Sequence, residues 1–224
     1  VAFAEVGDEL ETTVARKDSL SIVGPFATGL GNGENNLVLR ALTAFRTRWP
    51  GKLPEGLALR LAKNLPIAAG LGADVPMCLY SRPAEVRGIG EIVLPLKHFP
   101  ACHVVLVNPL VPVVTADVFR KLESRENPGL PDLGDPLTRP AQLGLWLDET
   151  RNDLEPPAIA MVPAIGDLID HLRTASGCIL SRMSGFGATV FGLFGSSAQA
   201  HQAAHDLREK WPGYWVAAAP LIGV

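Results

Sequence analysis

Apolar residues recur along the chain in two rhythms, one with a period of two residues and one with a period near 3.6. The two-residue period is typical of half-buried strands, and a continuous apolar run such as His103–Asn108 is typical of a buried strand. Ala2–Val14 alternates on both sides of Gly7-Asp8, which predicts a strand pair joined by a turn. The other predicted strands are Ser19–Val23, Gly56–Ala62, two strands within Val86–Leu94, Cys178–Met183, Ala188–Phe194 and Tyr214–Ala219.

Helical spacing predicts the remaining elements. Asn36–Trp49 has an apolar face at this spacing, and Asn35 or Asn36 can serve as its N-cap. Pro156–Thr174 has the same period, but Pro163 must break or restart the helix. The other predicted helices are Thr115–Leu122, with Thr115 as N-cap, and Ser197–Lys210.

Glycine and proline indicate how the chain is divided. Glu123–Pro140 contains four prolines and two glycines, and this density of breakers predicts an exposed loop. A second unit begins near Phe99-Pro100, which predicts domains at residues 1–98 and 99–224. Helices and strands arranged around antiparallel sheets place the chain in the α+β class.

Composition excludes several classes of protein. A chain of 224 residues with 47% hydrophobic and 19% charged residues is not disordered. A net charge of −3 argues against nucleic-acid binding, and no apolar run approaches the roughly 20 residues that span a membrane. The three cysteines, Cys78, Cys102 and Cys178, are widely spaced among apolar residues. They indicate reduced, buried thiols in a cytoplasmic protein.

A glycine-rich turn lies beside a lone carboxylate in Lys63–Leu79. Backbone N–H groups of the turn Pro66–Gly72 can face phosphate oxygens, and Asp74 follows two residues later among apolar neighbours. Those neighbours favour a partly desolvated carboxylate, which suits a base near neutral pH. Phosphoryl transfer needs both parts. The alternatives are a structural turn and, for Asp74, a helix N-cap.

Three other groups have both a structural and a functional interpretation. Ser184–Thr189 is either a hairpin turn or a wall beside a nucleotide, and Lys63 is either a surface residue or a neutraliser of phosphate charge. His201 and His205 are four residues apart on a predicted helix, but the sequence supplies no third ligand. We therefore predict surface histidines and no metal site formed by them.

Several of these motifs resemble the GHMP kinases, a family of small-molecule kinases that includes galactokinase, homoserine kinase and mevalonate kinase. LPIAAGLG resembles the family's second motif. LGADVPMCL followed by VRGIGE resembles the branch that phosphorylates the 2-hydroxyl of a cytidine diphosphate-linked methylerythritol in the non-mevalonate isoprenoid pathway. Supporting matches, which together cover nearly the whole chain, are FAEVGDELE, ENNLVLRA, VVTADVF, RNDLE and RMSGFGATVFGLF.

The resemblance implies an ATP-dependent enzyme that uses ATP and Mg²⁺ and acts as a monomer or weak homodimer. It implies the two-domain GHMP kinase fold, with a ribosomal protein S5 domain 2-like N-terminal domain and a ferredoxin-like C-terminal domain. Asp74 matches the catalytic aspartate, and Lys63 and Asn36 match positions near the nucleotide. Thr115 and Phe119 match positions that enclose the cytidine substrate. The positions that match the start of the phosphate loop are Pro66, Ile67, Ala68, Ala69 and Gly70.

The chain departs from the family pattern in three places. The family's catalytic lysine and a Tyr-His pair belong to a motif upstream of Val1, and a phosphate-loop turn with its helix is expected near residues 70–72. We therefore expect the chain to be the ordered part of a longer kinase. Phe186 occupies a position where the family has a small hydroxyl residue. Two alternatives stay open: another small-alcohol kinase of the family, and a non-catalytic nucleotide-binding member of the fold.

Overall fold

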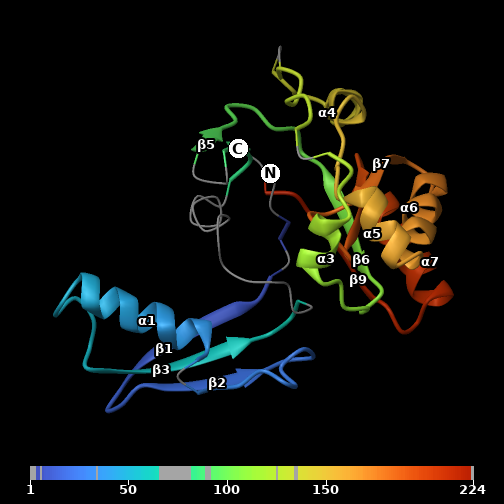
Figure 1. The fold of residues 1–224 in the computed structure, drawn as a ribbon. Helices are drawn as coiled ribbons and strands as arrows, with labels where there is room; N and C mark the ends of the chain where they lie inside the picture. The colour runs from blue at the N-terminus through green and yellow to red at the C-terminus, as the bar shows by residue number, and fades with distance from the viewer. Residues whose placement is uncertain are drawn as a thin grey trace. The chain divides into compact units, whose positions relative to one another are not determined.

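The chain folds as two compact units in the computed structural model, which describes residues 4–5, 7–33, 35–65, 82–88, 92–124, 126–133 and 136–222. The smaller unit comprises residues 6–68, and the larger comprises residues 1–5 and 69–224 (Figure 1). The predicted domain boundary between residues 98 and 99 stays a prediction. No helix in the described residues is long and apolar enough to cross a membrane.

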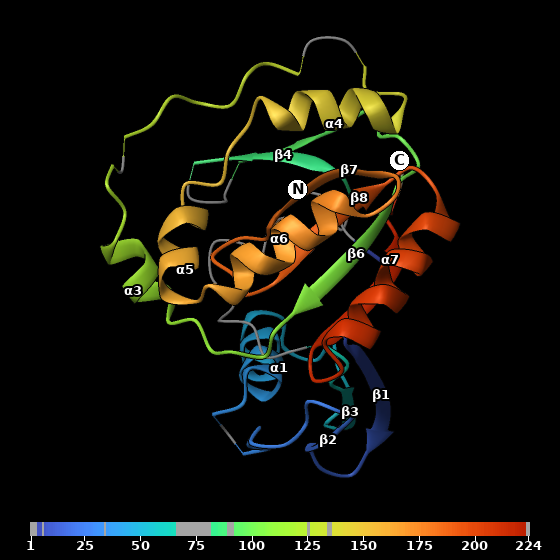
Figure 2. The same cartoon turned by 90° about the vertical axis from the view of Figure 1, so that its right-hand side faces the viewer.

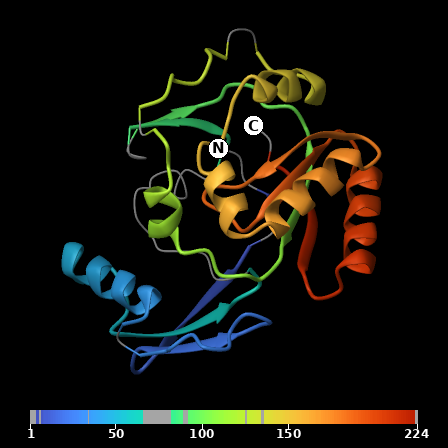
Figure 3. The ribbon, with the colours of Figure 1, turned by 45° about the vertical axis from the view of Figure 1, so that its right-hand side comes forward.

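The smaller unit is a three-stranded sheet covered by one helix. β3 (Gly56–Ala62) lies between β1 (Glu9–Ala15), which it pairs with antiparallel, and β2 (Ser19–Val23), which it pairs with parallel. A parallel pair needs a crossover connection, and α1 (Leu37–Arg48) supplies it (Figure 3). The core of the unit consists of Leu20, Leu57 and Leu59 of the sheet and Val38, Leu39 and Leu42 of the helix.

Asp18 joins the helix and the sheet of the smaller unit. Its carboxylate forms an ion pair with Arg46 on α1 and accepts a hydrogen bond from the backbone N–H of Leu57 at 2.9 Å. The hydrogen bond from Arg46, followed by that from Leu57, holds the pKa of the Asp18 carboxyl below its ordinary value of 3.8. These contacts stabilise the ionised form in the folded state.

We expect Asp18→Asn to lower the free energy of unfolding at pH 7 by about 1 kcal/mol, a value discounted for partial exposure. Because the folded pKa is lowered, the stabilisation is complete above the unfolded pKa and is lost as pH falls through the folded pKa. Urea unfolding at several pH values measures this. A difference between wild type and variant that persists below the folded pKa would contradict it.

The larger unit contains a hairpin of β4 (Ala84–Arg87) and β5 (Ile92–Pro95) and a four-stranded antiparallel sheet in the order β7-β8-β6-β9. This order and two of the intervening helices give the β-α-β-β-α-β pattern of a ferredoxin-like domain. The elements of this unit that follow the hairpin are β6 (His103–Asn108), α3 (Thr115–Arg120), α4 (Pro140–Asp148), α5 (Glu155–Met161), α6 (Ala164–Thr174), β7 (Cys178–Met183), β8 (Val190–Phe194), α7 (Ser197–Lys210) and β9 (Trp215–Pro220).

Both faces of the four-stranded sheet are covered. α6 and α7 pack on one face (Figure 2). The main core there includes Ile165, Leu172 and Leu207 of the helices and Val105 and Phe194 of the sheet. A second core on the other face joins α4 to the sheet and contains Cys102, Leu137, Leu143, Leu180 and Leu193. The four-stranded sheet is therefore buried on both faces and is the centre of the larger unit.

Two predictions about secondary structure are wrong, and one helix is not predicted. The described part of Ala2–Val14 forms no hairpin: Ala4 bridges Leu221, and β1 pairs with β3, because β3 offers an apolar partner in register. Thr115 does not cap α3, since the N-cap is Val114 and no side chain bonds there. The described residues of the predicted loop Glu123–Pro140 form an irregular, mostly exposed segment as far as Arg139. The helix α4 is not predicted; it begins at Pro140, where the missing N–H costs nothing.

Candidate functional site

The structure describes four of the predicted site residues. Lys63 and Asn36 lie in the smaller unit, and Thr115 and Phe119 lie in the larger one. Asp74 and the loop positions Pro66, Ile67, Ala68, Ala69 and Gly70 lie outside the described residues, and their roles stay predictions. The structure therefore tests the surroundings of the first four only.

Lys63 is not a freely solvated surface residue. Its side chain is only 12% exposed, and its ammonium lies 2.5 Å from Oδ2 of Asp8. It directly follows β3, so the central strand of the sheet fixes its backbone. A buried stem with a paired ammonium at its tip suits a lysine that meets a ligand phosphate in a fixed place.

Asn36 uses its side chain within its own loop. Its Oδ1 accepts from the backbone N–H of Val38 at 2.9 Å, which confirms the predicted N-cap of α1. Its Nδ2 donates to the carbonyl of Gly31 at 2.7 Å. These bonds fix the start of α1, and the predicted place of Asn36 near a nucleotide stays a prediction.

Phe119 presents its ring to solvent on α3, next to residues that fix the helix. The ring residue is 45% exposed, whereas its neighbour Val118 is fully buried in the main core. Leu110, Val111 and Val114 just before it are also exposed and apolar. An exposed aromatic ring on a fixed short helix can stack on a planar ligand such as a nucleobase.

The glycine-containing segment Ser184–Thr189 joins β7 to β8, as the predicted hairpin requires. Gly185 and Gly187 have φ values of 56° and 88°, which residues with a Cβ atom rarely adopt. The backbone N–H of Ser184 donates to Thr189 O at 2.9 Å and closes the turn. A second role as a wall beside a nucleotide stays a prediction, as does any effect of Phe186 there.

Residues of the RNDLE segment hold this turn from outside the hairpin. Asn152 Nδ2 donates to the carbonyls of Met183 at 3.1 Å and Gly185 at 2.7 Å. Glu155 Oε2 accepts from the backbone N–H of Met183 at 2.8 Å. The sequence pattern assigns no role to Asn152 or Glu155, because a polar residue before a helix looks the same whether it caps the helix or reaches another loop.

We expect Asn152→Ala to lower the free energy of unfolding by about 2 kcal/mol, since two carbonyls lose their donor. Urea denaturation measures this. The control is Asn127→Ala, because Asn127 is exposed and its bonds to described residues are exposed ones, the shortest being to Asp153 at 3.0 Å. We expect the control to change stability by less than about 0.5 kcal/mol. Equal losses in the two variants would contradict the role of Asn152.

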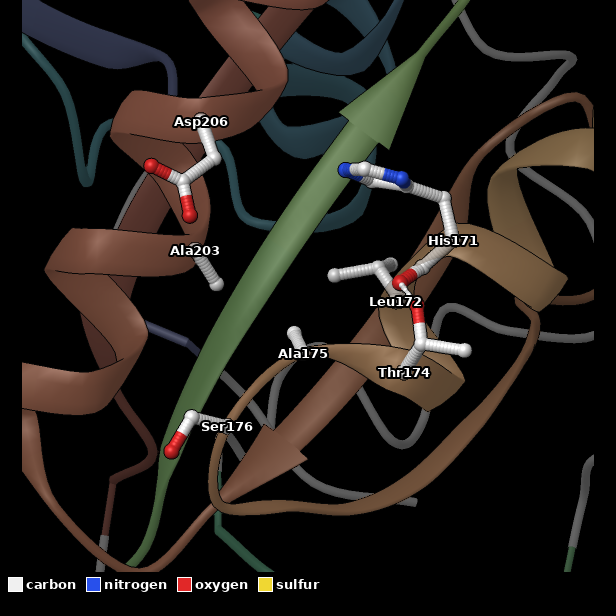
Figure 4. A pocket seen from close by; sticks show the side chains of 7 residues that line it. All are labelled: His171, Leu172, Thr174, Ala175, Ser176, Ala203 and Asp206. Atoms are coloured by element: carbon white, nitrogen blue, oxygen red, sulfur yellow. Dashed lines mark hydrogen bonds between the residues drawn. The ribbon is translucent and has the colours of Figure 1, made fainter.

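Neither of two surface hollows lined by described residues of the larger unit explains phosphoryl transfer. One of about 210 Å³ lies between α6 and α7, where His171 and Asp206 come from the two sides (Figure 4). Burial, followed by the charge of Lys210, lowers the pKa of His171, while Asp206 opposes this. The other, of about 410 Å³, follows α3 and is lined by Asp117, Arg120, Lys121 and Met161. The first is smaller than ordinary ligand sites.

The described cysteines and histidines form neither a nucleophile nor a metal centre. Cys102 and Cys178 are free, and burial raises the pKa of both thiols, that of Cys102 to about 11. Cys78 lies outside the described residues. Among the residues that the structure describes, no group of three His, Cys, Asp or Glu could hold a metal ion. Mg²⁺ that arrives with a nucleotide needs only one or two protein carboxylates, because phosphates and water supply its other ligands.

Comparison with known sequences finds close relatives over nearly the full chain. Residues 129–213 match the family model for the C-terminal domain of GHMP kinases. The chain is 42% identical over 246 residues to the 4-diphosphocytidyl-2-C-methyl-D-erythritol kinase of Paracoccus denitrificans, covering 99% of this chain and 86% of that protein. It is 38% identical over 255 residues to that of Cereibacter sphaeroides (strain ATCC 17029), covering 100% and 89%.

The longer alignment bears on the predicted gap in the chain. The match to the Cereibacter sphaeroides protein spans 255 residues, whereas this chain has 224 residues, so at least 31 aligned positions have no counterpart here. The alignment lengths do not locate these positions along the chain. The predicted gap near residues 70–72 stays a prediction.

Comparison with solved structures finds the same fold. The structure of a 4-(cytidine 5'-diphospho)-2C-methyl-D-erythritol kinase matches with a TM-score of 0.72 and 27% identity, covering 97% of this chain and 87% of that one. The homoserine kinase of Cytophaga hutchinsonii matches with a TM-score of 0.63 and 17% identity, covering 97% and 89%. L. major mevalonate kinase matches with a TM-score of 0.58 and 15% identity, covering 97% and 88%. At these identities the last two indicate the fold alone.

Proposed function

The chain belongs to the 4-diphosphocytidyl-2-C-methyl-D-erythritol kinase family of the GHMP kinases, and we propose that it phosphorylates the 2-hydroxyl of that substrate with ATP and Mg²⁺. The α+β GHMP kinase fold and the kinase class predicted from the sequence are confirmed by these relatives. The substrate assignment places the enzyme in the non-mevalonate route to isoprenoid precursors. The observation that supports this substrate is the 38–42% identity to two 4-diphosphocytidyl-2-C-methyl-D-erythritol kinases along nearly the whole chain.

The proposed mechanism depends on positioning and charge neutralisation. Backbone N–H groups of Ile67 to Gly70 hold the ATP phosphates, and Lys63 supplies positive charge beside them. The substrate hydroxyl approaches the γ-phosphate with Asp74 beside it to orient the hydroxyl and take its proton. Mg²⁺, when bound with ATP, neutralises phosphate charge. The paired ammonium of Lys63, on a side chain that is only 12% exposed, supports its part in this scheme.

The cytidine end of the substrate is assigned to α3 of the larger unit. Phe119 offers an exposed ring for the cytosine, and Thr115 lies one helical turn away. Val118, buried between them in sequence, fixes the helix against the main core. This arrangement supports a fixed platform for the base, on which stacking lowers the KM for the substrate.

Parallel phosphorylation assays test the function. The full chain is offered ATP with the cytidylyl substrate, with homoserine and with mevalonate, and we expect turnover of the first substrate only. Turnover of another alcohol would favour a different kinase of the superfamily. Tight nucleotide binding with no turnover of any alcohol would favour a non-catalytic member of the fold.

A further inference from the structure

Asp8 lies just before β1 and uses both carboxylate oxygens to hold the residues that follow β3. Its Oδ1 accepts from the backbone N–H groups of Asn64 at 2.7 Å and Leu65 at 2.9 Å. Its Oδ2 accepts from the ammonium of Lys63 at 2.5 Å. The hydrogen-bonded ladder between β1 and β3 ends at the Glu9–Ala62 pair, so Asp8 and Lys63 are the first residues beyond it. One side chain therefore replaces the ladder and fixes three consecutive residues.

The backbone of Lys63 is fixed from the other side as well. Its N–H donates to Val23 O at 2.7 Å, and its carbonyl accepts from Phe26 N at 3.2 Å. Gly24, with φ of 103°, lies so close that a Cβ on it would be 2.6 Å from the Lys63 carbonyl oxygen. Within the part of the chain that the structure describes, Asp8 is the only acceptor of the ammonium's hydrogen bonds. An ammonium has three N–H donors, so one bond to Asp8 does not by itself use up its capacity to bind a phosphate.

We propose that Asp8 is a positioning residue that acts on the nucleotide through Lys63, an inference that rests on the proposed kinase function. A flexible lysine loses much side-chain freedom when it binds a phosphate, whereas one already held by a carboxylate loses less. Leu65 is followed in the sequence by Pro66, the first residue of the predicted phosphate loop. The Asp8 carboxylate therefore also holds Leu65, the last described residue before that loop.

Asp8→Asn separates the charge from the backbone contacts, because an amide oxygen can still accept from Asn64 and Leu65. Calorimetric titration of the full chain with a non-hydrolysable ATP analogue and Mg²⁺ measures nucleotide affinity. We expect the Kd and the KM for ATP to rise about tenfold, with kcat and the KM for the alcohol within about twofold of wild type. In a Lys63→Met background, where Asp8 has no ammonium to hold, we expect Asp8→Asn to change the Kd by less than about twofold.

Asp18→Asn is the matched control. Asp18 also holds a basic side chain and a backbone N–H, those of Arg46 and Leu57, but at the start of β3 instead of its end. We expect this variant to lose stability and keep the wild-type Kd. Circular dichroism checks that all variants fold. Asp8→Glu keeps the negative charge, so we expect it to bind the nucleotide more tightly than Asp8→Asn.

The outcomes separate the role of Asp8 from the proposed function. If the wild-type chain binds the nucleotide and Asp8→Asn has an unchanged or lower Kd, the role of Asp8 is overturned and the proposed function is not. An equal rise in Kd in the Lys63→Met background would show that Asp8 does not act through Lys63. A wild-type chain that binds no nucleotide would overturn the proposed function itself. Turnover of a different alcohol would change the substrate and leave this inference standing, since the titration contains no alcohol.

Discussion

Asp74→Asn is expected to lower kcat by about 10²–10⁴-fold, the contribution typical of a positioned general base. The amide has nearly the shape of the carboxylate, but it cannot take the proton of the substrate hydroxyl and adds no negative charge to orient it. The KM for ATP should change little, because the proposed nucleotide contacts come from Lys63 and the loop before Asp74. Steady-state kinetics with the cytidylyl substrate measure both quantities.

The control for this prediction is Asp170→Asn on α6. The Asp170 side chain is 75% exposed and forms only a surface ion pair with Arg173 at 3.0 Å. We expect this variant to keep the wild-type kcat and stability, since such pairs contribute little. Near-normal turnover in Asp74→Asn would count decisively against a catalytic role, provided that circular dichroism shows the same fold. A large loss of stability in Asp74→Asn would instead favour the alternative in which Asp74 caps a helix.

The sequence pattern predicts the ends of several elements well because local signals agree with tertiary packing there. Ser19–Val23, Gly56–Ala62 and Ser197–Lys210 begin and end where the periodicity predicts, and Asn36 caps its helix. α4 is missed because its mean apolar character hides a helical period and because Pro140 looks like a breaker. The helix is stabilised by Leu143, which packs on the sheet. This contact joins residues that are far apart in the sequence, so the local pattern does not predict it.

The candidate site divides in the same way. The motif around Asp74 is visible in the sequence because neighbouring residues form it, and the family resemblance adds Lys63 and Phe119. Asp8 is hidden, since its partners are 55 to 57 positions away and a Gly-Asp pair is an ordinary turn signal. Pairs of residues that meet only through the sheet register cannot be read from spacing along the chain.

The role of the smaller unit follows from these distant contacts. Its sheet places the residue after β3 between Asp8 on one side and Gly24 on the other, so the chain leaves the sheet with a fixed backbone and a fixed ammonium. In the larger unit, Asn152 and Glu155 hold the turn after β7 in a comparable way. In both units a polar side chain far away in the sequence fixes a loop that follows a strand. Rigid strands and fixed loop ends favour the precise alignment that phosphoryl transfer needs.

Phe119→Ala is expected to raise the KM for the cytidylyl substrate about 5- to 150-fold, since a base–aromatic stack contributes about 1–3 kcal/mol. The ring is 45% exposed, so its removal leaves no large cavity, and the free energy of unfolding should change little. The KM for ATP should stay near the wild-type value, and Phe119→Tyr, which keeps the ring, should restore most of the affinity.

Leu145→Ala on α4 is the matched control for Phe119→Ala. Leu145 is 73% exposed and belongs to the same unit, but no prediction assigns it to the substrate. A rise in KM confined to Phe119→Ala would support the stacking platform on α3, because general loss of apolar surface would affect both variants. Equal KM values in wild type and Phe119→Ala would move the cytidine site away from α3. If Phe119→Ala raised the KM for ATP by a larger factor than the KM for the cytidylyl substrate, the ring would be assigned to the nucleotide instead.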